Sequence, residues 1–253
     1  MRTVLAIGIG AGDPDQVTVE AIRALNRADV FFVMDKGPAA ADLRAVRHMI
    51  CERYIDDPSY RVVEVPDPPR DLSGPSYAGD VAAWHDKRVA IYETVLLNQL
   101  ADHEVGAFLV WGDPALYDST LRLLDAVAAG GAVAFTVEVV PGISSIQALA
   151  AAHRIALHGV GHPVHITTGR RLATDGWPPD VADLVVMLDA DCTFAQVDPA
   201  GVTIYWGAYL GTPDQILVSG ALAEVTVEIQ EVRAEARARK GWMFDTYLLR
   251  RGE

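Results

Sequence analysis

The chain has 253 residues, a formal net charge of −13 and 51% hydrophobic residues. This length supports a substantial core in one large α/β domain or two smaller ones, and the composition predicts a soluble globular protein. The negative charge opposes nonspecific binding to nucleic acid and to anionic lipid, because both need fixed positive charge on the protein. No segment approaches the roughly 20 consecutive apolar residues of a membrane span. We therefore expect neither a nucleic-acid nor a membrane partner.

The N-terminus and the cysteines favour a cytoplasmic protein. The apolar run in MRTVLAIGIG is short and passes into Gly-Asp-Pro, so we interpret it as a first β-strand and not as a signal peptide. Cys51 and Cys192 lie far apart in the sequence and form no Cys-x-x-Cys pair. Both observations are typical of a protein of the reducing cytoplasm.

Strand-like and helix-like patterns alternate through the first half of the chain. Strands are predicted over residues 3–9, 29–34, 60–65, 106–113 and 132–142. Helices are predicted over about 19–25, 41–54, 77–100 and 119–129. Continuous apolar strands separated by helices predict a parallel sheet covered on both faces, with ligands beyond the carboxyl ends of its strands.

Residues 67–79, DPPRDLSGPSYAG, interrupt this alternation and predict an exposed loop, because they are rich in proline, glycine and aspartate. A lid and an ordinary surface excursion are equally good interpretations of a loop of this length.

The pattern changes in the second half. A helix is predicted from about Ser144, and strand-like runs with fewer and shorter helices follow at residues 162–171, 183–190, 202–211, 224–232 and 242–251. The basic run 233–240 has interleaved glutamates and predicts a solvated helix face. We predict two α/β domains, an N-terminal one with a parallel sheet over residues 1–141 and a C-terminal one with a mixed sheet over residues 142–253.

The first predicted strand ends in GIGAGDPDQVT, residues 8–18. A dinucleotide fingerprint needs G-x-G-x-x-G turning directly into a helix, whereas the spacing here is G-x-G-x-G. Asp13 would place a carboxylate where phosphate should sit, and Pro14 lacks an N–H donor. These features disfavour a nicotinamide-dependent oxidoreductase, and the missing Lys-Ser/Thr excludes a P-loop. Taken alone, the motif also fits a tight turn without a ligand.

Two further glycine turns follow predicted strands, in VWGDPALYDST (residues 110–120) and in VVPGISS (residues 139–145). Because the carboxyl ends of parallel strands meet at one edge of a sheet, the three turns can line a single cleft with backbone donors and acceptors. Such a cleft suits a ligand with an adenine edge, a ribose and an amino acid end.

This ordered set resembles the tetrapyrrole (corrin/porphyrin) methyltransferase family, whose members use S-adenosylmethionine. The likeness covers nearly the whole chain, and one small departure is Val17, where members usually carry leucine. The matched positions are Gly8, Gly10, Gly12, Asp13, Pro14, Thr18, Ala28, Asp29, Val30, Gly112, Asp113, Pro114, Tyr117 and residues 141–145.

The resemblance implies an S-adenosylmethionine cleft between the two domains, S-adenosylhomocysteine as the product, and a homodimer. The cofactor-binding positions that it implies are Gly12, Asp13, Pro14, Trp111, Gly112, Asp113, Leu116, Ser144, Ser145, Met187, Leu188, Ala208 and Tyr209.

Further strings narrow the resemblance to members that act on a corrin precursor, among them VFFVMDKG, PVHITTGRRL, IYWGAYLGTPDQILVSG and KGWMFDTYLLRR. The implied reaction is methylation of precorrin-5 at C-1 with loss of acetate, giving precorrin-6A in cobalamin biosynthesis. Two alternatives remain: a methyltransferase of the same family with another substrate, and a non-catalytic S-adenosylmethionine-binding protein.

The implied chemistry asks for few catalytic groups. A sulfonium is already an activated methyl donor, so methyl transfer mainly needs alignment. Loss of the acyl group needs a base for water and a donor to the carbonyl. Asp113 and Tyr117 are the first candidates for these roles, and Asp13 and His85 are further candidates. A structural role explains each of these residues equally well.

Arg170 and Arg171, in TTGRRL, are the candidate substrate-binding residues, because a guanidinium grips a carboxylate bidentately. Exposed surface charge is the alternative interpretation. We expect no metal, because the histidines between 153 and 165 lack a metal-binding spacing.

Overall fold

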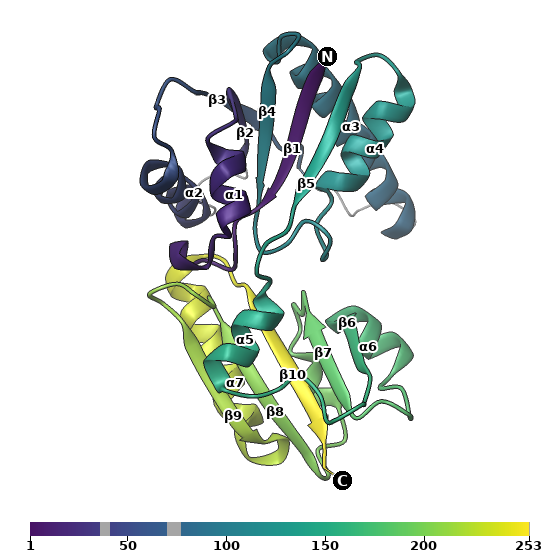
Figure 1. Cartoon of the computed structure of the whole chain (residues 1–253). Helices are drawn as coiled ribbons and strands as arrows, with labels where there is room; N and C mark the ends of the chain where they lie inside the picture. Colours follow the sequence, from purple (N-terminus) through teal and green to yellow (C-terminus); the bar gives the residue numbers. More distant parts are fainter. Residues whose placement is uncertain (36–40, 70–76, 253) are drawn as a thin grey trace. The chain divides into compact units, whose positions relative to one another are not determined.

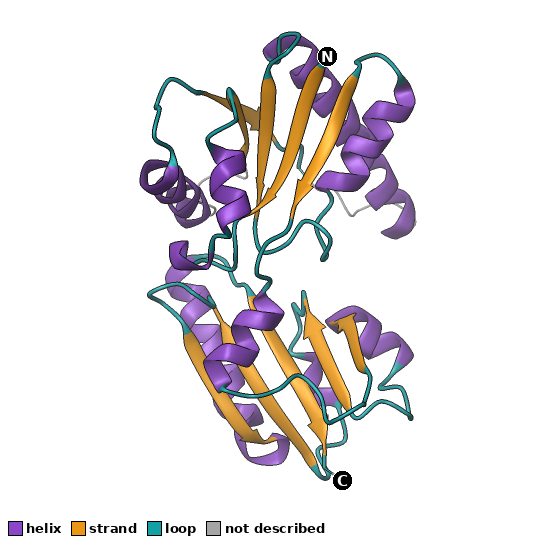
Figure 2. Cartoon of the chain, in the orientation of Figure 1, coloured by secondary structure: helices purple, strands orange, loops and turns teal. Residues whose placement is uncertain are grey.

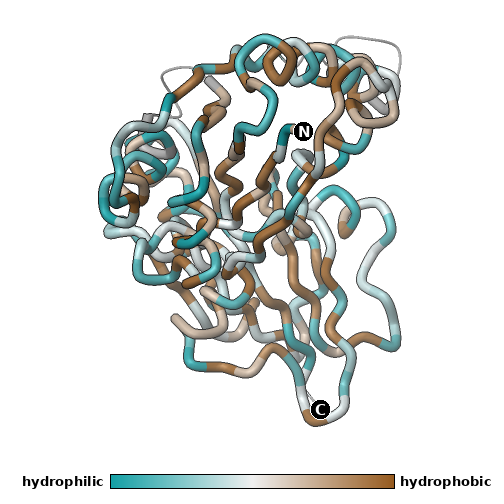
Figure 3. The backbone as a smooth tube through the Cα atoms, turned by 45° about the horizontal axis from the view of Figure 1, so that its top comes forward, coloured by the Kyte–Doolittle hydropathy of each residue, from teal (hydrophilic) through white to brown (hydrophobic). Residues whose placement is uncertain are grey.

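A computed structural model describes residues 1–35, 41–69 and 77–252. The chain forms two compact units. The N-terminal unit comprises Met1–Gly10 and Pro14–Ile143, and the C-terminal unit comprises Ala11–Asp13 and Ser144–Glu253. Hydrophobic residues follow the strands in both units (Figure 3). Along the described ranges, no helix combines the length and the apolar character that crossing a membrane requires.

The N-terminal unit is a parallel sheet with helices on both faces (Figure 1). In the order β3-β2-β4-β1-β5, its strands are β1 (Arg2–Gly8), β2 (Val30–Asp35), β3 (Arg61–Pro66), β4 (Val105–Val110) and β5 (Phe135–Val140). Its helices are η1 (Pro14–Gln16), α1 (Val19–Leu25), α2 (Ala41–Tyr54), α3 (Tyr77–Gln99) and α4 (Thr120–Gly130). Alternate strand residues pack against α1 and α2 on one face and against α3 and α4 on the other. The predicted parallel sheet is confirmed.

The C-terminal unit is a mixed sheet, as predicted (Figure 2). In the order β6-β7-β10-β8-β9, its strands are β6 (Val164–Thr168), β7 (Asp183–Met187), β8 (Val202–Ala208), β9 (Ile216–Ala221) and β10 (Asp245–Arg251). Its helices are α5 (Ser145–His153), α6 (Gly169–Asp175), η3 (Thr193–Gln196) and α7 (Leu222–Lys240). On β8, Trp206 faces the core beneath α7, whereas Tyr205 meets His153 of α5 on the opposite face.

The prediction of a strand over residues 224–232 is wrong. These residues belong to α7, and the neighbouring strand is Ile216–Ala221. Valine and isoleucine at 225, 227 and 229 alternate as in a strand, yet Val227 is 63% exposed. The buried positions 222, 229, 233 and 236 follow helical spacing. These intervals of seven, four and three residues place the four side chains on one face of a helix. Their burial in the core therefore outweighs the local strand-like alternation.

The prediction of a solvated face over residues 233–240 is wrong at Arg233, which is 7% exposed. Its Nε donates to Asp245 Oδ2 at 2.8 Å, and its Nη2 donates to the carbonyl of Asp189 at 2.7 Å. Trp206 Nε1 donates to the same Asp245 oxygen at 3.0 Å. Burial raises the pKa of Asp245, and the hydrogen bond from Arg233 opposes that rise. The pair ties α7 to β10.

We expect Ile229→Ala to lower the free energy of unfolding by about 2–5 kcal/mol, because Ile229 is fully buried beneath the sheet. Val227→Ala is the matched control two residues away on the exposed side of the helix, where a change within about 0.5 kcal/mol is expected. Urea unfolding measures both. Equal losses in the two variants would contradict the assignment of the faces of α7.

Candidate functional site

Three glycine turns meet at the carboxyl edge of the N-terminal sheet, where β4, β1 and β5 are neighbours. Gly10 N donates to Gly112 O at 3.3 Å, and Gly112 N donates to Gly10 O at 2.8 Å. A Cβ on Gly142 would lie 2.1 Å from Gly112 O, and one on Gly8 would lie 2.5 Å from Gly142 N. Only glycine permits this approach, so the predicted convergence of the turns is confirmed.

Two of these glycines also adopt backbone φ angles that glycine reaches more easily than other residues. Gly10 has φ 83° and Gly112 has φ 72°, in the left-handed region that side chains disfavour. The chain then enters η1, and α1 begins only at Val19, with Thr18 Oγ1 accepting from Ala21 N at 3.0 Å. A dinucleotide cradle requires the free N–H groups of a helix to follow the glycine turn directly. Here η1 separates the turn from α1, so this requirement is not met.

Asp113 binds backbone with both carboxylate oxygens. Oδ2 accepts from Gly142 N at 2.9 Å, and Oδ1 accepts from Ala115 N at 2.8 Å. The side chain thus joins the turn after β4 to the turn after β5. This geometry favours the structural interpretation of Asp113 over a base in the reaction. Trp111 and Leu116 lie on the same turn, and Leu116 N donates to Asp113 O at 3.2 Å.

Tyr117 ends this turn with a left-handed backbone, φ 51°, and its side chain is 42% exposed. Partial burial raises the pKa of its phenol above the usual 10. The hydroxyl is therefore protonated at neutral pH. It can donate a hydrogen bond to a ligand carbonyl, and it cannot serve as a ready general base.

The C-terminal candidates collect at one end of their own sheet. Met187 of β7 pairs with Thr246 of β10, and Ala208 of β8 pairs with Asp245, so the two strand ends lie together. Ser145 Oγ and Thr246 Oγ1 are 2.9 Å apart at this end. Thr246 is only 3% exposed. Thr246 was not predicted from the sequence at this end of the sheet, because its place follows from strand register.

Leu188 and Tyr209 come directly after β7 and β8 with φ of 52° and 49°. Left-handed backbone is uncommon for side chains of this size and marks constrained turns. Tyr209 is held by its neighbours: its hydroxyl donates to Trp242 O at 2.7 Å, and its N donates to Phe244 O at 2.9 Å. Leu188 is 56% exposed.

Ser144 caps α5, where its Oγ accepts from Ile146 N at 3.2 Å and its N donates to Gln147 Oε1 at 3.1 Å. This capping box satisfies the helix start with a side chain that is 3% exposed. The Ser144 hydroxyl thus has a structural task beside any contact with a ligand.

Arg170 and Arg171 lie in the first turn of α6, and both are exposed. Arg171 Nη1 lies 3.1 Å from Asp175 Oδ2 on the same helix, with both side chains more than half exposed. Exposed ion pairs of this kind contribute about 0–1 kcal/mol, so this one can open at little cost.

The loop predicted over residues 67–79 lies partly outside the described residues, which leave out 70–76. At its start, Asp67 forms an ion pair with Arg88 of α3 at 3.0 Å, and Pro68 O accepts from Trp84 Nε1 at 2.9 Å. The ring of His85 lies 5.3 Å from that of Trp84.

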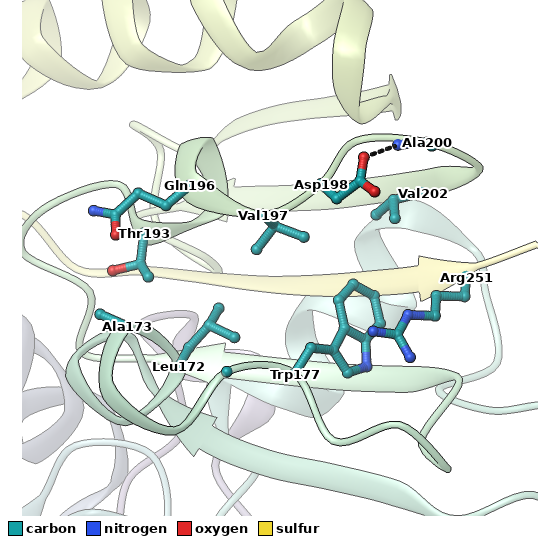
Figure 4. Close-up of a pocket in the computed structure, with 11 residues that line it drawn as sticks. Leu172, Ala173, Trp177, Thr193, Gln196, Val197, Asp198, Ala200, Val202 and Arg251 are labelled. Atoms are coloured by element: carbon teal, nitrogen blue, oxygen red, sulfur yellow. Dashed lines mark hydrogen bonds between the residues drawn. The ribbon is translucent and has the colours of Figure 1, made fainter.

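A cavity of about 380 Å³ lies in the C-terminal unit between α6 and η3 (Figure 4). Trp177 and Arg251 form one wall, with the guanidinium 4.3 Å from the ring centroid. No residue predicted to bind cofactor or substrate lines this cavity. Within residues 1–35, 41–69 and 77–252, no three His, Cys, Asp or Glu side chains gather as a metal ion would require.

Known proteins match the chain along its length. It is 52% identical over 252 residues to "Precorrin-6A synthase [deacetylating]" of Sinorhizobium sp, covering 100% of the chain and 96% of that protein. It is 30% identical to "Precorrin-2 C(20)-methyltransferase" of Sinorhizobium sp over 145 residues, 57% of the chain and 55% of that protein.

Solved structures also match the chain over nearly its whole length. A cobalamin synthesis related protein (CobF) from Corynebacterium diphtheriae is 35% identical, with a TM-score of 0.86 and full coverage of both chains. Uroporphyrin-III C-methyltransferase from Thermus thermophilus, solved with S-adenosylhomocysteine, shares the fold at 20% identity and a TM-score of 0.59, over 98% of this chain and 91% of that one. The sequence pattern of the Tetrapyrrole (Corrin/Porphyrin) Methylases matches residues 3–226. The chain belongs to the tetrapyrrole (corrin/porphyrin) methylase family.

Proposed function

We propose that the protein is an S-adenosylmethionine-dependent C-methyltransferase that methylates precorrin-5 at C-1, with loss of acetate, to give precorrin-6A. The observation that carries this proposal is the 52% identity to a precorrin-6A synthase over the whole chain. The relative that acts on precorrin-2 matches only 57% of the chain, which supports this substrate over an earlier precursor.

The carboxyl edge of the N-terminal sheet, where the three glycine turns meet, fits the cofactor. Gly8 and Gly142 leave no room for a Cβ, so backbone N–H and C=O groups form this part of the edge, and such groups suit the adenosine and amino acid ends of S-adenosylmethionine. We assign the binding contacts in the N-terminal unit to Pro14, Trp111, Gly112, Asp113 and Leu116. The other assigned contacts are Gly12, Asp13, Ser144, Ser145, Met187, Leu188, Ala208 and Tyr209.

When bound, S-adenosylmethionine supplies an activated methyl group, so the protein's main task is to hold the acceptor carbon in line with it. Loss of the two-carbon acyl group requires water to add to its carbonyl before the carbon–carbon bond breaks and acetate leaves. The Tyr117 hydroxyl is suited to polarise that carbonyl, because a phenol is protonated at neutral pH and can donate a hydrogen bond. We further propose a homodimer that works in the cytoplasm.

The reaction is tested by incubating the purified protein with precorrin-5 and methyl-labelled S-adenosylmethionine. We expect a labelled corrin and one acetate for each methyl group transferred. Methylation without acetate would point to another substrate within the family. Cofactor binding without turnover of any precorrin would point to a non-catalytic binding protein.

We expect Gly142→Ala to weaken S-adenosylhomocysteine binding at least tenfold, because the new methyl group would displace the Gly112 turn. The matched control is Gly130→Ala near the end of α4, where the nearest atom to a Cβ is 3.5 Å away and affinity should not change. Titration calorimetry measures binding and thermal unfolding checks the fold. Unchanged affinity in Gly142→Ala would refute the placement of the cofactor.

Arg170→Ala and Arg171→Ala should weaken corrinoid binding and leave S-adenosylhomocysteine affinity nearly intact. A lost charged hydrogen bond costs about 1.5–3 kcal/mol, or roughly ten- to a hundredfold in affinity. Asp175→Ala is the control, because it removes the partner of Arg171 and keeps both guanidinium groups. Normal corrinoid binding by both arginine variants would show that these residues are surface charges.

A further inference from the structure

One face of α3 carries three side chains that contact the N-terminal sheet or the loops at its carboxyl edge. Trp84, Arg88 and Tyr92 are spaced four residues apart and therefore share a face of the helix. Trp84 binds the backbone just after β3, as described above. Tyr92 stacks on Phe108 of β4, with ring centroids 4.7 Å apart and planes at 2°. Arg88 lies between these two contacts.

Arg88 joins two loops with one guanidinium. Its Nη1 donates to Ser119 Oγ at 2.6 Å, and its Nε lies 3.0 Å from Asp67 Oδ1. Asp67 follows β3 and Ser119 closes the turn that follows β4. The guanidinium also lies 4.7 Å from the Trp84 ring centroid, and the residue is only 5% exposed. The planar guanidinium presents its N–H groups in a fixed fork, so it pairs with Asp67 and donates to Ser119 at the same time, whereas a lysine offers one compact ammonium without that fork.

The hydroxyl of Ser119 is used in an unusual way. Ser119 is the N-cap of α4, a position where serine is favoured because its oxygen accepts from the helix N–H groups. Here the side chain makes no capping hydrogen bond and accepts from Arg88 instead. The preceding Asp118 accepts from Thr120 N at 2.7 Å. The serine thus anchors the turn to α3, while a neighbour satisfies an N–H of the helix start.

We propose that Arg88 is a positioning residue, which fixes the turn over residues 112–119 through Ser119 and so keeps its backbone in place to bind the cofactor. The inference rests on the proposed function, because this turn carries the assigned contacts Trp111, Gly112, Asp113 and Leu116. In this proposal Arg88 acts through Ser119 and not through a contact of its own with cofactor or substrate.

Amide hydrogen exchange tests the structural step without a ligand. In Ser119→Ala and Arg88→Lys, we expect the amides of residues 113 and 115–120 to exchange roughly three- to tenfold faster, whereas Ser119→Thr should keep them protected. Arg88→Lys keeps a positive charge beside Asp67, so the fold is expected to survive. The matched control is Thr94→Ala, which removes an exposed hydroxyl that donates to Ala90 O of the same helix. Unchanged exchange in Ser119→Ala and Arg88→Lys would overturn the proposal.

Calorimetry with S-adenosylhomocysteine tests the functional step. We expect Ser119→Ala and Arg88→Lys to bind roughly three- to tenfold more weakly, with Ser119→Thr and Thr94→Ala close to the unaltered protein. A turn that exchanges faster yet binds with unchanged affinity would overturn the positioning role. If the unaltered protein does not bind, the proposed function fails, and the exchange experiment still decides whether Arg88 fixes the turn.

Discussion

The close approach of the Gly8, Gly112 and Gly142 backbones is the constraint on which the candidate site depends. A carbonyl oxygen occupies the space where a Cβ of Gly142 would lie, so the ends of β1, β4 and β5 can meet only without side chains. Parallel strands bring their carboxyl ends to one edge in any case. The glycines remove the side chains that would separate the turns there, so the backbones of the three turns come into contact.

Polar side chains around this edge mostly hold backbone in place. Asp113 uses both carboxylate oxygens on N–H groups, and Ser144 caps a helix. Groups engaged in this way are poor proton carriers but fix atoms precisely, which matches a reaction in which alignment of an activated methyl group is the main requirement. Tyr117 differs, because it is 42% exposed and its phenol, whose pKa burial raises, is protonated at neutral pH.

The sequence allowed prediction of both sheets and of the glycine turns, because alternating apolar runs and Gly-Asp-Pro motifs are local signals. It misled at residues 224–232, where the spacing of valine and isoleucine fits a strand and a helix alike and only the core beneath α7 decides. Arg233 looked solvated because its partner Asp245 lies twelve residues away. The places of Thr246 and Arg88 could not be predicted, because they follow from strand register and from helix packing, which no short motif encodes.

Buried arginines in this acidic chain are matched to internal carboxylates and cannot serve an acidic substrate. Arg88 and Arg233 are at most 7% exposed, and Arg233 pairs with an aspartate whose side chain is 5% exposed. Breaking such a pair leaves an uncompensated buried charge, which costs about 3–5 kcal/mol. The Arg171–Asp175 pair is exposed and contributes little, so a substrate carboxylate can replace Asp175 without that penalty. In a chain of net charge −13, the proposed binding of an acidic substrate is therefore best assigned to exposed guanidinium groups whose existing partners are easily exchanged.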